Sequence, residues 1–131
     1  MRNMKLLGAM WILLLTGYAY AQDKLPPGVQ SRKADSGIAV LADAKGMTLY
    51  TFGRDTEGKS NCNGQCAMNW PPLAAAAAAK SMGDWTVVTR DDGSMQWAYK
   101  GKPLYTFAKD AKPGDTTGNG AGNNNWHAAM P

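Results

Sequence analysis

Short segments in which hydrophobic and polar residues alternate recur along the chain, and turn-forming residues follow them. Such alternation, with many β-branched and aromatic side chains, is typical of strands that bury one face. Asp and Gly occur together at residues 43–46 and 91–93, where tight turns are expected. The pattern predicts a mostly β domain with five short strands, at residues 38–43, 47–52, 85–90, 95–99 and 103–107.

One of these segments occurs twice. The residues at 46–55, Gly-Met-Thr-Leu-Tyr-Thr-Phe-Gly-Arg-Asp, recur at 101–110 as Gly-Lys-Pro-Leu-Tyr-Thr-Phe-Ala-Lys-Asp. Six positions are identical and a seventh is basic in both, which indicates an internal duplication. Residues 37–131 are therefore expected to form a small single domain of two quasi-equivalent β-hairpin or meander repeats. The repeats cover residues 37–73 and 84–131.

Six residues of the duplicated motif are candidate site residues. One interpretation places their aromatic rings in the core, or in a seam between the copies, and lets each Asp cap its turn. The other is a paired site, in which Tyr and Asp side chains of the two copies face one another across a pseudo-two-fold axis. Trp70 and Trp126 follow the motif aspartates by 15 and 16 positions and are expected to be equivalent core residues. The six residues are Tyr50, Phe52, Asp55, Tyr105, Phe107 and Asp110.

Three segments lack a strand pattern. Residues 22–36 contain Pro-Pro-Gly and mixed charges without a period, so we expect a flexible N-terminal segment there. The six alanines at 74–79 predict a surface loop or one or two helical turns between the repeats. Residues 112–125 are rich in Gly, Asn and Thr and predict a loop.

The first 21 residues have the pattern of a secretory signal peptide. A basic start at Arg2 and Lys5 precedes an apolar run at 6–15, and Ala19-Tyr20-Ala21 supplies a cleavage site. The run is shorter than the roughly 20 residues that span a bilayer, although a retained anchor is the alternative. We therefore expect a soluble periplasmic or secreted protein with no integral membrane span after cleavage at Ala21.

The charge of the chain gives little support for a nucleic-acid partner. The formal net charge of its 131 residues is +4, and the signal peptide contains two of the basic residues. The remaining Lys and Arg are scattered rather than clustered, so we expect no nucleic acid.

The cysteine pair allows two interpretations. Cys62 and Cys66, in an exported protein, most simply form a disulfide. Alternatively, the two thiolates bind copper, with His127 as a third ligand, or carry out thiol-redox chemistry. The spacing is neither that of a thioredoxin motif nor that of a haem-attachment motif.

Enzyme signatures are missing from the sequence. His127 is the sole histidine, no serine lies in a G-x-S-x-G segment, and there is neither a phosphate-binding loop nor a dinucleotide fingerprint. We therefore expect a non-enzymatic binding or interaction module, whose partner is an envelope protein or a small ligand. A hydrolase-like enzyme that uses His127 with the motif Tyr and Asp residues is a further hypothesis.

Several motifs together resemble a known family. They are the two Tyr-Thr-Phe-x-[Lys/Arg]-Asp segments, Cys-Asn-Gly-Gln-Cys-Ala at 62–67, Trp-Pro-Pro-Leu at 70–73, and the run from Gln96 to Tyr105. The chain resembles the predicted bacterial lipoproteins with a Yx(FWY)xxD motif, also called the secreted repeat of unknown function. The resemblance covers nearly all of residues 37–127 and implies no established activity. Many members carry a lipobox cysteine after the signal, where this chain has Gln22, so we do not expect a lipid anchor.

Overall fold

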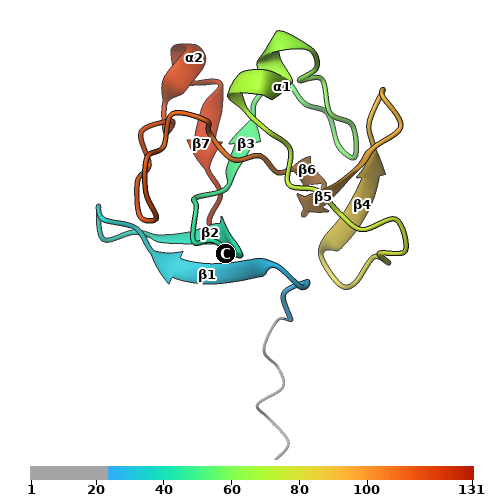
Figure 1. Cartoon of the computed structure of the whole chain (residues 1–131), viewed down its shortest axis with the longest axis horizontal. Coiled ribbons are helices and arrows are strands. Elements are labelled where there is room, and N and C mark those ends of the chain that lie inside the picture. The colour runs from blue at the N-terminus through green and yellow to red at the C-terminus, as the bar shows by residue number, and fades with distance from the viewer. Residues whose placement is uncertain (1–23) are drawn as a thin grey trace, which may run out of the picture.

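The computed structural model describes residues 24–131, and the signal peptide predicted at 1–21 lies outside the described residues. Most of the regular structure is β, and it forms one small domain, as the sequence predicts (Figure 1). The described elements are β1 (Val29–Lys33), β2 (Ala39–Asp43), β3 (Tyr50–Phe52), α1 (Gln65–Asn69), β4 (Trp85–Thr89), β5 (Met95–Tyr99), β6 (Lys102–Pro103), α2 (Ala121–Asn124) and β7 (Trp126–Ala128).

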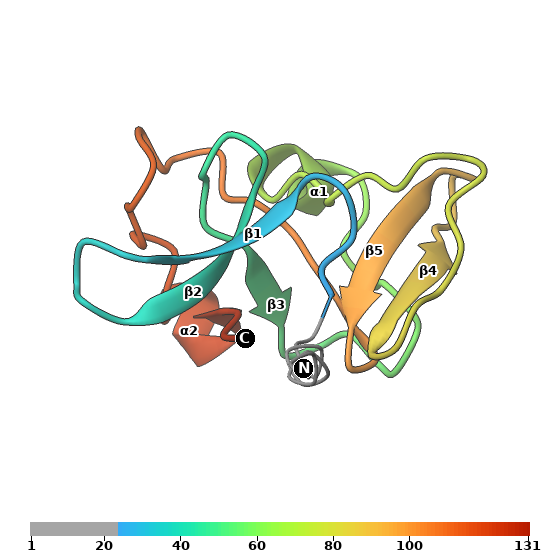
Figure 2. The same cartoon turned by 90° about the horizontal axis from the view of Figure 1, so that it is seen from below.

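The strands form three small antiparallel sheets. β1 pairs with β2, β3 pairs with β7, and β4, β5 and β6 form the third sheet in that order. The β1–β2 register runs from Val29 opposite Asp43 to Lys33 opposite Ala39. The β4–β5 hairpin repeats this register 56 residues later, from Trp85 opposite Tyr99. The two hairpins lie on either side of β3 (Figures 1 and 2).

The prediction of a flexible segment at residues 22–36 is wrong at residues 29–33, which form β1. Only Val29 and Arg32 of β1 are partly buried, so its residues carry no apolar alternation that the sequence could reveal. The strand is held instead by backbone pairing along the edge of β2, whose Val40, Leu41 and Ala42 are buried. The first repeat therefore begins at β1, before residue 37.

The linker between the repeats contains no helix. Ala74 pairs with Gln96 in an isolated bridge, and the Ala75 N–H donates to the Met95 carbonyl at 3.0 Å. The alanine run thus starts as an extended strand partner of β5 and continues as a surface turn, which is the first of the two predicted alternatives. The segment predicted to be a loop at 112–125 contains the short helical turn α2.

A pseudo-two-fold axis passes between the two motif tyrosines. The Tyr50 N–H donates to the Tyr105 carbonyl at 2.7 Å, and the Tyr105 N–H donates to the Tyr50 carbonyl at 3.0 Å. Two further bonds, on either side of the axis, are related by the same symmetry. The Ala129 N–H donates to the Leu49 carbonyl at 2.8 Å, and the Leu73 N–H donates to the Leu104 carbonyl at 2.9 Å. The two copies therefore share their hydrogen-bond pattern as well as their sequence motif.

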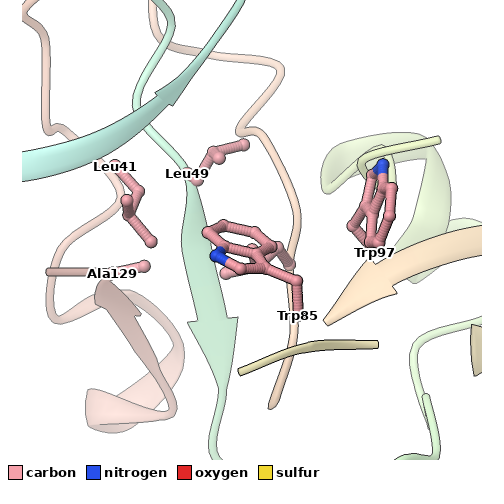
Figure 3. Packing of buried hydrophobic residues seen from close by; sticks show 6 residues of the cluster. Leu41, Leu49, Trp85, Trp97 and Ala129 are labelled. Atoms are coloured by element: carbon pink, nitrogen blue, oxygen red, sulfur yellow. The ribbon is translucent and has the colours of Figure 1, made fainter. Parts of the chain in front are cut away.

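Two hydrophobic clusters form the core, and residues of both copies contribute to each. The first contains Leu41 of β2 together with Trp85 and Trp97 of the β4–β5 hairpin, whose rings meet edge to face at 6.3 Å (Figure 3). The second lies on the other face of the motif strands, as the predicted alternation of Leu49 and Tyr50 requires. The clusters are Leu41, Leu49, Trp85, Trp97, Leu104 and Ala129, and Tyr50, Cys62, Trp70, Tyr105 and Trp126.

Candidate site between the two copies

The tyrosine of each motif bonds to the aspartate of the other motif. The Tyr50 hydroxyl donates to Asp110 at 2.6 Å, and the Tyr105 hydroxyl donates to Asp55 at 2.6 Å. Both tyrosine side chains are fully buried. The structure thus brings together the four polar residues of the motif across the pseudo-two-fold axis.

Each aspartate also holds the backbone turn that follows it. Asp55 accepts the Asn61 N–H at 2.7 Å, and Asp110 accepts the Thr117 N–H at 3.0 Å and its hydroxyl at 2.6 Å. Each carboxylate thus bonds both to the tyrosine of the other copy and to the backbone of its own copy. The turn-capping role expected for the motif aspartates is therefore present, combined with the cross-copy bond.

Burial shifts the ionisation of these groups. It raises the pKa of Tyr50 and of Tyr105 well above the usual value, and the neighbouring carboxylates Asp110 and Asp55 add to the effect. Burial also raises the pKa of Asp55, although the hydrogen bond from Tyr105 opposes this. Both tyrosines are consequently held as neutral hydrogen-bond donors at neutral pH.

Four aromatic rings stack beside the tyrosines. Trp70 and Trp126 lie parallel, with centroids 3.8 Å apart and an interplanar angle of 2°. Phe52 stacks on Trp126 at 4.3 Å, and Phe107 stacks on Trp70 at 4.0 Å. The two tryptophans are equivalent core residues, as the sequence predicts, and they meet face to face at the seam.

A second repeated segment precedes each of these tryptophans. Residues 63–70 read Asn-Gly-Gln-Cys-Ala-Met-Asn-Trp, and residues 119–126 read Asn-Gly-Ala-Gly-Asn-Asn-Asn-Trp. Of these residues only the tryptophans were predicted to be equivalent, although four identical positions indicate the repeat. This repeated segment forms the helical turns α1 and α2, which lie at equivalent places in the two copies.

The disulfide occurs in the first copy only. Cys62 and Cys66 are bonded, and their counterparts in the second copy are Gly118 and Gly122. A Cβ atom at Gly118 would come within 2.6 Å of the Trp70 ring, so a cysteine does not fit there. The copies therefore differ in how the segment before the tryptophan is fixed.

The alternative copper site is not assembled in this state. Bonded cysteines provide no thiolates, and three His, Cys, Asp or Glu side chains in an arrangement able to hold a metal ion are not found within residues 24–131. His127 lies exposed on β7, opposite Thr51 of β3.

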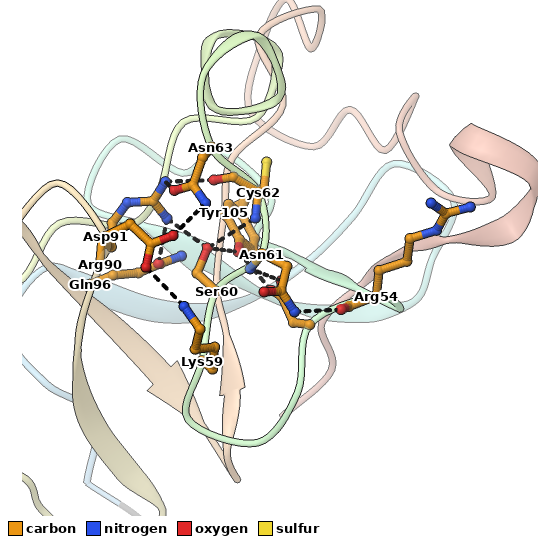
Figure 4. A network of polar contacts seen from close by, with 11 residues as sticks. Arg54, Lys59, Ser60, Asn61, Cys62, Asn63, Arg90, Asp91, Gln96 and Tyr105 are labelled. Atoms are coloured by element: carbon orange, nitrogen blue, oxygen red, sulfur yellow. Dashed lines mark hydrogen bonds and ion pairs between the residues drawn. The ribbon is translucent and has the colours of Figure 1, made fainter.

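A buried arginine connects the disulfide segment to the motif of the second copy (Figure 4). Arg90 is 5 % exposed, and its guanidinium donates to Ser60 Oγ at 2.9 Å, Gln96 Oε1 at 2.8 Å and the Cys62 carbonyl at 2.6 Å. Ser60 Oγ also lies 2.6 Å from the Tyr105 hydroxyl. The burial of Arg90 could not be predicted from the sequence, because a single basic residue before a turn is ordinarily exposed.

Two pockets lie on the face of the molecule that presents His127, and both are lined by it. The loop pocket, of about 280 Å³, is bordered by four charged residues, Asp55, Glu57, Lys100 and Lys102. The strand pocket, of about 230 Å³, is formed between β2, β7 and the segment before α2. The counterpart of His127 in the other copy is Pro71, so this arrangement belongs to one half of the domain.

A third pocket lies beneath the alanine run. It has a volume of about 410 Å³ and is lined by Pro27, alanines of the linker, Met82 and Trp97, with Lys80 as its charged residue. Its apolar walls offer few groups that could orient a ligand.

The fold and site define a duplicated, mostly β domain whose two copies are joined by reciprocal Tyr–Asp bonds. The sequence profile of a family described as a secreted repeat of unknown function matches residues 32–74 and, a second time, residues 86–130. The chain belongs to this family. Comparison with curated proteins and with solved structures gave no significant match. Within residues 24–131, no helix is long and apolar enough to cross a membrane.

Proposed function

We propose that this protein is an exported, non-enzymatic binding module of the periplasm or the extracellular space. Its ligand, an envelope protein or a small molecule, binds on the face where His127 lies between the loop pocket and the strand pocket. The observation that carries the proposal is that these two pockets share a residue that departs from the internal symmetry.

The motif residues support a binding module rather than an enzyme. Tyr50 and Tyr105 are buried, and each of their hydroxyls bonds to a carboxylate that also holds a turn. A general acid or base must reach the substrate, and neutral tyrosines with strongly raised pKa values are poor bases. The motif therefore acts as the scaffold, and the ligand contacts come from surface positions at which the copies differ.

A photo-reactive amino acid in place of His127 tests the proposed face. The variant is expected to cross-link its ligand in the compartment that normally contains the protein, with the product identified by mass spectrometry. The matched control replaces Thr89, an exposed residue of β4, and is expected to give no such product. Equal labelling at both positions, or none at His127, would contradict a ligand on this face.

Thiol-redox or copper chemistry at Cys62 and Cys66 is the alternative function. The observation in its favour is that Cys66 is only partly buried, whereas Cys62 is fully buried. It requires that part of the protein in its own compartment carries two free thiols or bound copper. Native mass spectrometry with a thiol count measures this, and a fully oxidised, metal-free protein would remove the alternative.

A further inference from the structure

The strand pocket is the pseudo-symmetric counterpart of the buried Arg90 site. The hairpins correspond with an offset of 56 residues, since Arg90 N–H donates to Ser94 O at 2.8 Å and Ala34 N–H donates to Ile38 O at 2.8 Å. Ala34 therefore takes the place of Arg90 in the first copy. It is buried, with 4 % of its surface exposed.

The residues that surround the arginine also have counterparts in the strand pocket. Three side chains contact the Arg90 guanidinium. The residues 56 positions away from them in the sequence, their counterparts in the other copy, all line the strand pocket. Ser60 corresponds to Thr116, Asn63 to Asn119, and Gln96 to Val40.

The strand pocket retains two of these three polar positions but lacks the group that they surround. Thr116 and Asn119 still present a hydroxyl and an amide, while Ala34 is too short to reach them. The Asn119 amide oxygen accepts the Ala128 N–H at 3.0 Å and has a second acceptor position for a guanidinium. Ile38 and Met130 add apolar walls, and both are more than half exposed. The pocket thus combines polar acceptors with an apolar entrance, which suits the aliphatic stem and polar head of an arginine.

A guanidinium does not need a carboxylate contact at such a site. At the Arg90 site, the direct acceptors of the guanidinium are a hydroxyl, two side-chain amides and a backbone carbonyl. The nearest negative charge in that network is Asp91, which accepts a bond from the Asn63 side-chain amide at 3.1 Å. Its counterpart beside the strand pocket is Asp35, which pairs with Lys112 at 2.7 Å.

We propose that the strand pocket binds a guanidinium group, supplied either by an arginine side chain of a peptide or by a small free guanidine. The group enters between Ile38 and Met130, and its N–H groups donate to Thr116 and Asn119. This assignment names the ligand class of the proposed binding module and rests on that function.

Titration of 15N-labelled protein with three probes tests the assignment. Ethylguanidinium and the blocked peptide acetyl-Gly-Arg-Gly-amide are expected to shift the amide resonances of Val40, Thr116 and Asn119 with Kd values on the order of 1 mM or below. The same peptide with citrulline, which is neutral and of similar shape, is expected to bind at least about tenfold more weakly. Tighter binding of the arginine peptide than of ethylguanidinium identifies a peptide ligand, and equal binding identifies a free guanidine.

Substitution of Ala34 by arginine tests most directly whether the strand pocket binds a guanidinium. Ala34→Arg supplies the missing side chain from within the chain and is expected to weaken probe binding at least about tenfold while the dispersed spectrum is retained. Ser31→Arg adds the same charge at an exposed position of β1 and is expected to leave binding unchanged. Thr116→Val, which keeps the shape but removes the hydroxyl acceptor, is expected to weaken binding several-fold and serves if Ala34→Arg fails to fold.

The outcomes separate this assignment from the broader proposal. If neither guanidinium probe shifts these resonances, or if Ala34→Arg folds and binds the probes like the wild type, the assignment is overturned. A cross-link at His127 to a ligand without a guanidinium would overturn it as well and leave the binding module standing. The absence of any His127-specific cross-link would count against the binding module itself.

Discussion

The hydroxyl group of each motif tyrosine contributes more to the stability of the fold than one ordinary hydrogen bond does, because its loss affects a turn in the other copy. Tyr105 meets Asp55 and Ser60, while Tyr50 meets Asp110 and the Gly118 N–H at 3.3 Å. Removal of either hydroxyl leaves a partly or fully buried carboxylate with one donor fewer. The penalty for a buried acceptor without its partner exceeds the net contribution of the bond.

Tyr105→Phe and Tyr50→Phe are each expected to lower the free energy of unfolding by about 1–3 kcal/mol. Urea unfolding followed by tryptophan fluorescence measures the change. Tyr99→Phe is the matched control: Tyr99 is partly buried, and its hydroxyl makes no hydrogen bond within the described part of the chain. A loss at Tyr99 as large as at Tyr105 would show that the cross-copy bonds contribute nothing specific.

Stability is expected to fall at alkaline pH. The folded state raises the pKa of Tyr50 and Tyr105, so it keeps their protons at pH values where unfolded tyrosines, with a pKa of about 10, release them. The contribution of both groups is complete below pH of about 10 and is lost as the pH rises toward the folded values. Unfolding that coincides with the rise in tyrosinate absorbance above pH 10 would confirm this; ionisation of all tyrosines in a fully folded protein would contradict it.

At the level of elements, α1 is a short turn that two contacts fix at its start. The Cys62–Cys66 bond closes the loop, and the Cys62 carbonyl is held by Arg90. Its counterpart α2 has no disulfide and contains Gly122 and Asn123 in left-handed backbone conformations. The two copies therefore reach the same position of their tryptophan by different means.

Reduction of the disulfide is expected to cost about 2 kcal/mol of stability, since the chain-entropy effect of so short a loop is small. The difference between urea unfolding with and without a phosphine reductant measures the cost. The domain is expected to remain folded, because Arg90 still holds the segment. Complete unfolding on reduction would show that the disulfide is essential.

The sequence predicted those strands that contribute buried apolar residues to the core. β2, β4 and β5 follow the pattern because their apolar residues enter the clusters. β1 could not be predicted in this way, since it is held by backbone pairing and leaves Gln30 and Ser31 exposed. The segment predicted at 103–107 is mostly not a strand: β6 ends at Pro103, and Tyr105 forms only isolated bridges.

The site was predictable in part. The duplication placed Tyr50, Asp55, Tyr105 and Asp110 near one axis, but it could not show that each tyrosine bonds to the aspartate of the other copy. That crossing depends on how the motif strands pair, which local periodicity does not determine. Arg90 and the pockets beside His127 depend on contacts between distant segments and were not predictable.

At the level of the whole molecule, neither copy is complete. The Tyr–Asp bonds and the stack of Phe52 on Trp126 cross between the copies, as does the stack of Phe107 on Trp70. Each half alone would expose these rings and leave its tyrosine without its carboxylate. Cooperative folding of the whole domain is therefore expected.

Fragments of residues 24–78 and 79–131 test this interdependence. Each alone is expected to lack a dispersed NMR spectrum, and the two are expected to recover the spectrum of the intact domain when mixed. Tyr105→Phe in the second fragment is expected to weaken the association. A folded, monomeric fragment of either half would contradict the interdependence.

The reciprocal bonds at the axis also have a historical consequence. A single ancestral copy could satisfy them only with an identical partner, so the ancestral unit was complete as a homodimer with a true two-fold axis. In such a dimer every substitution occurs twice and must suit both halves. Fusion into one chain removed that constraint, and the arginine, the cysteine pair and the histidine each now occur in one half only.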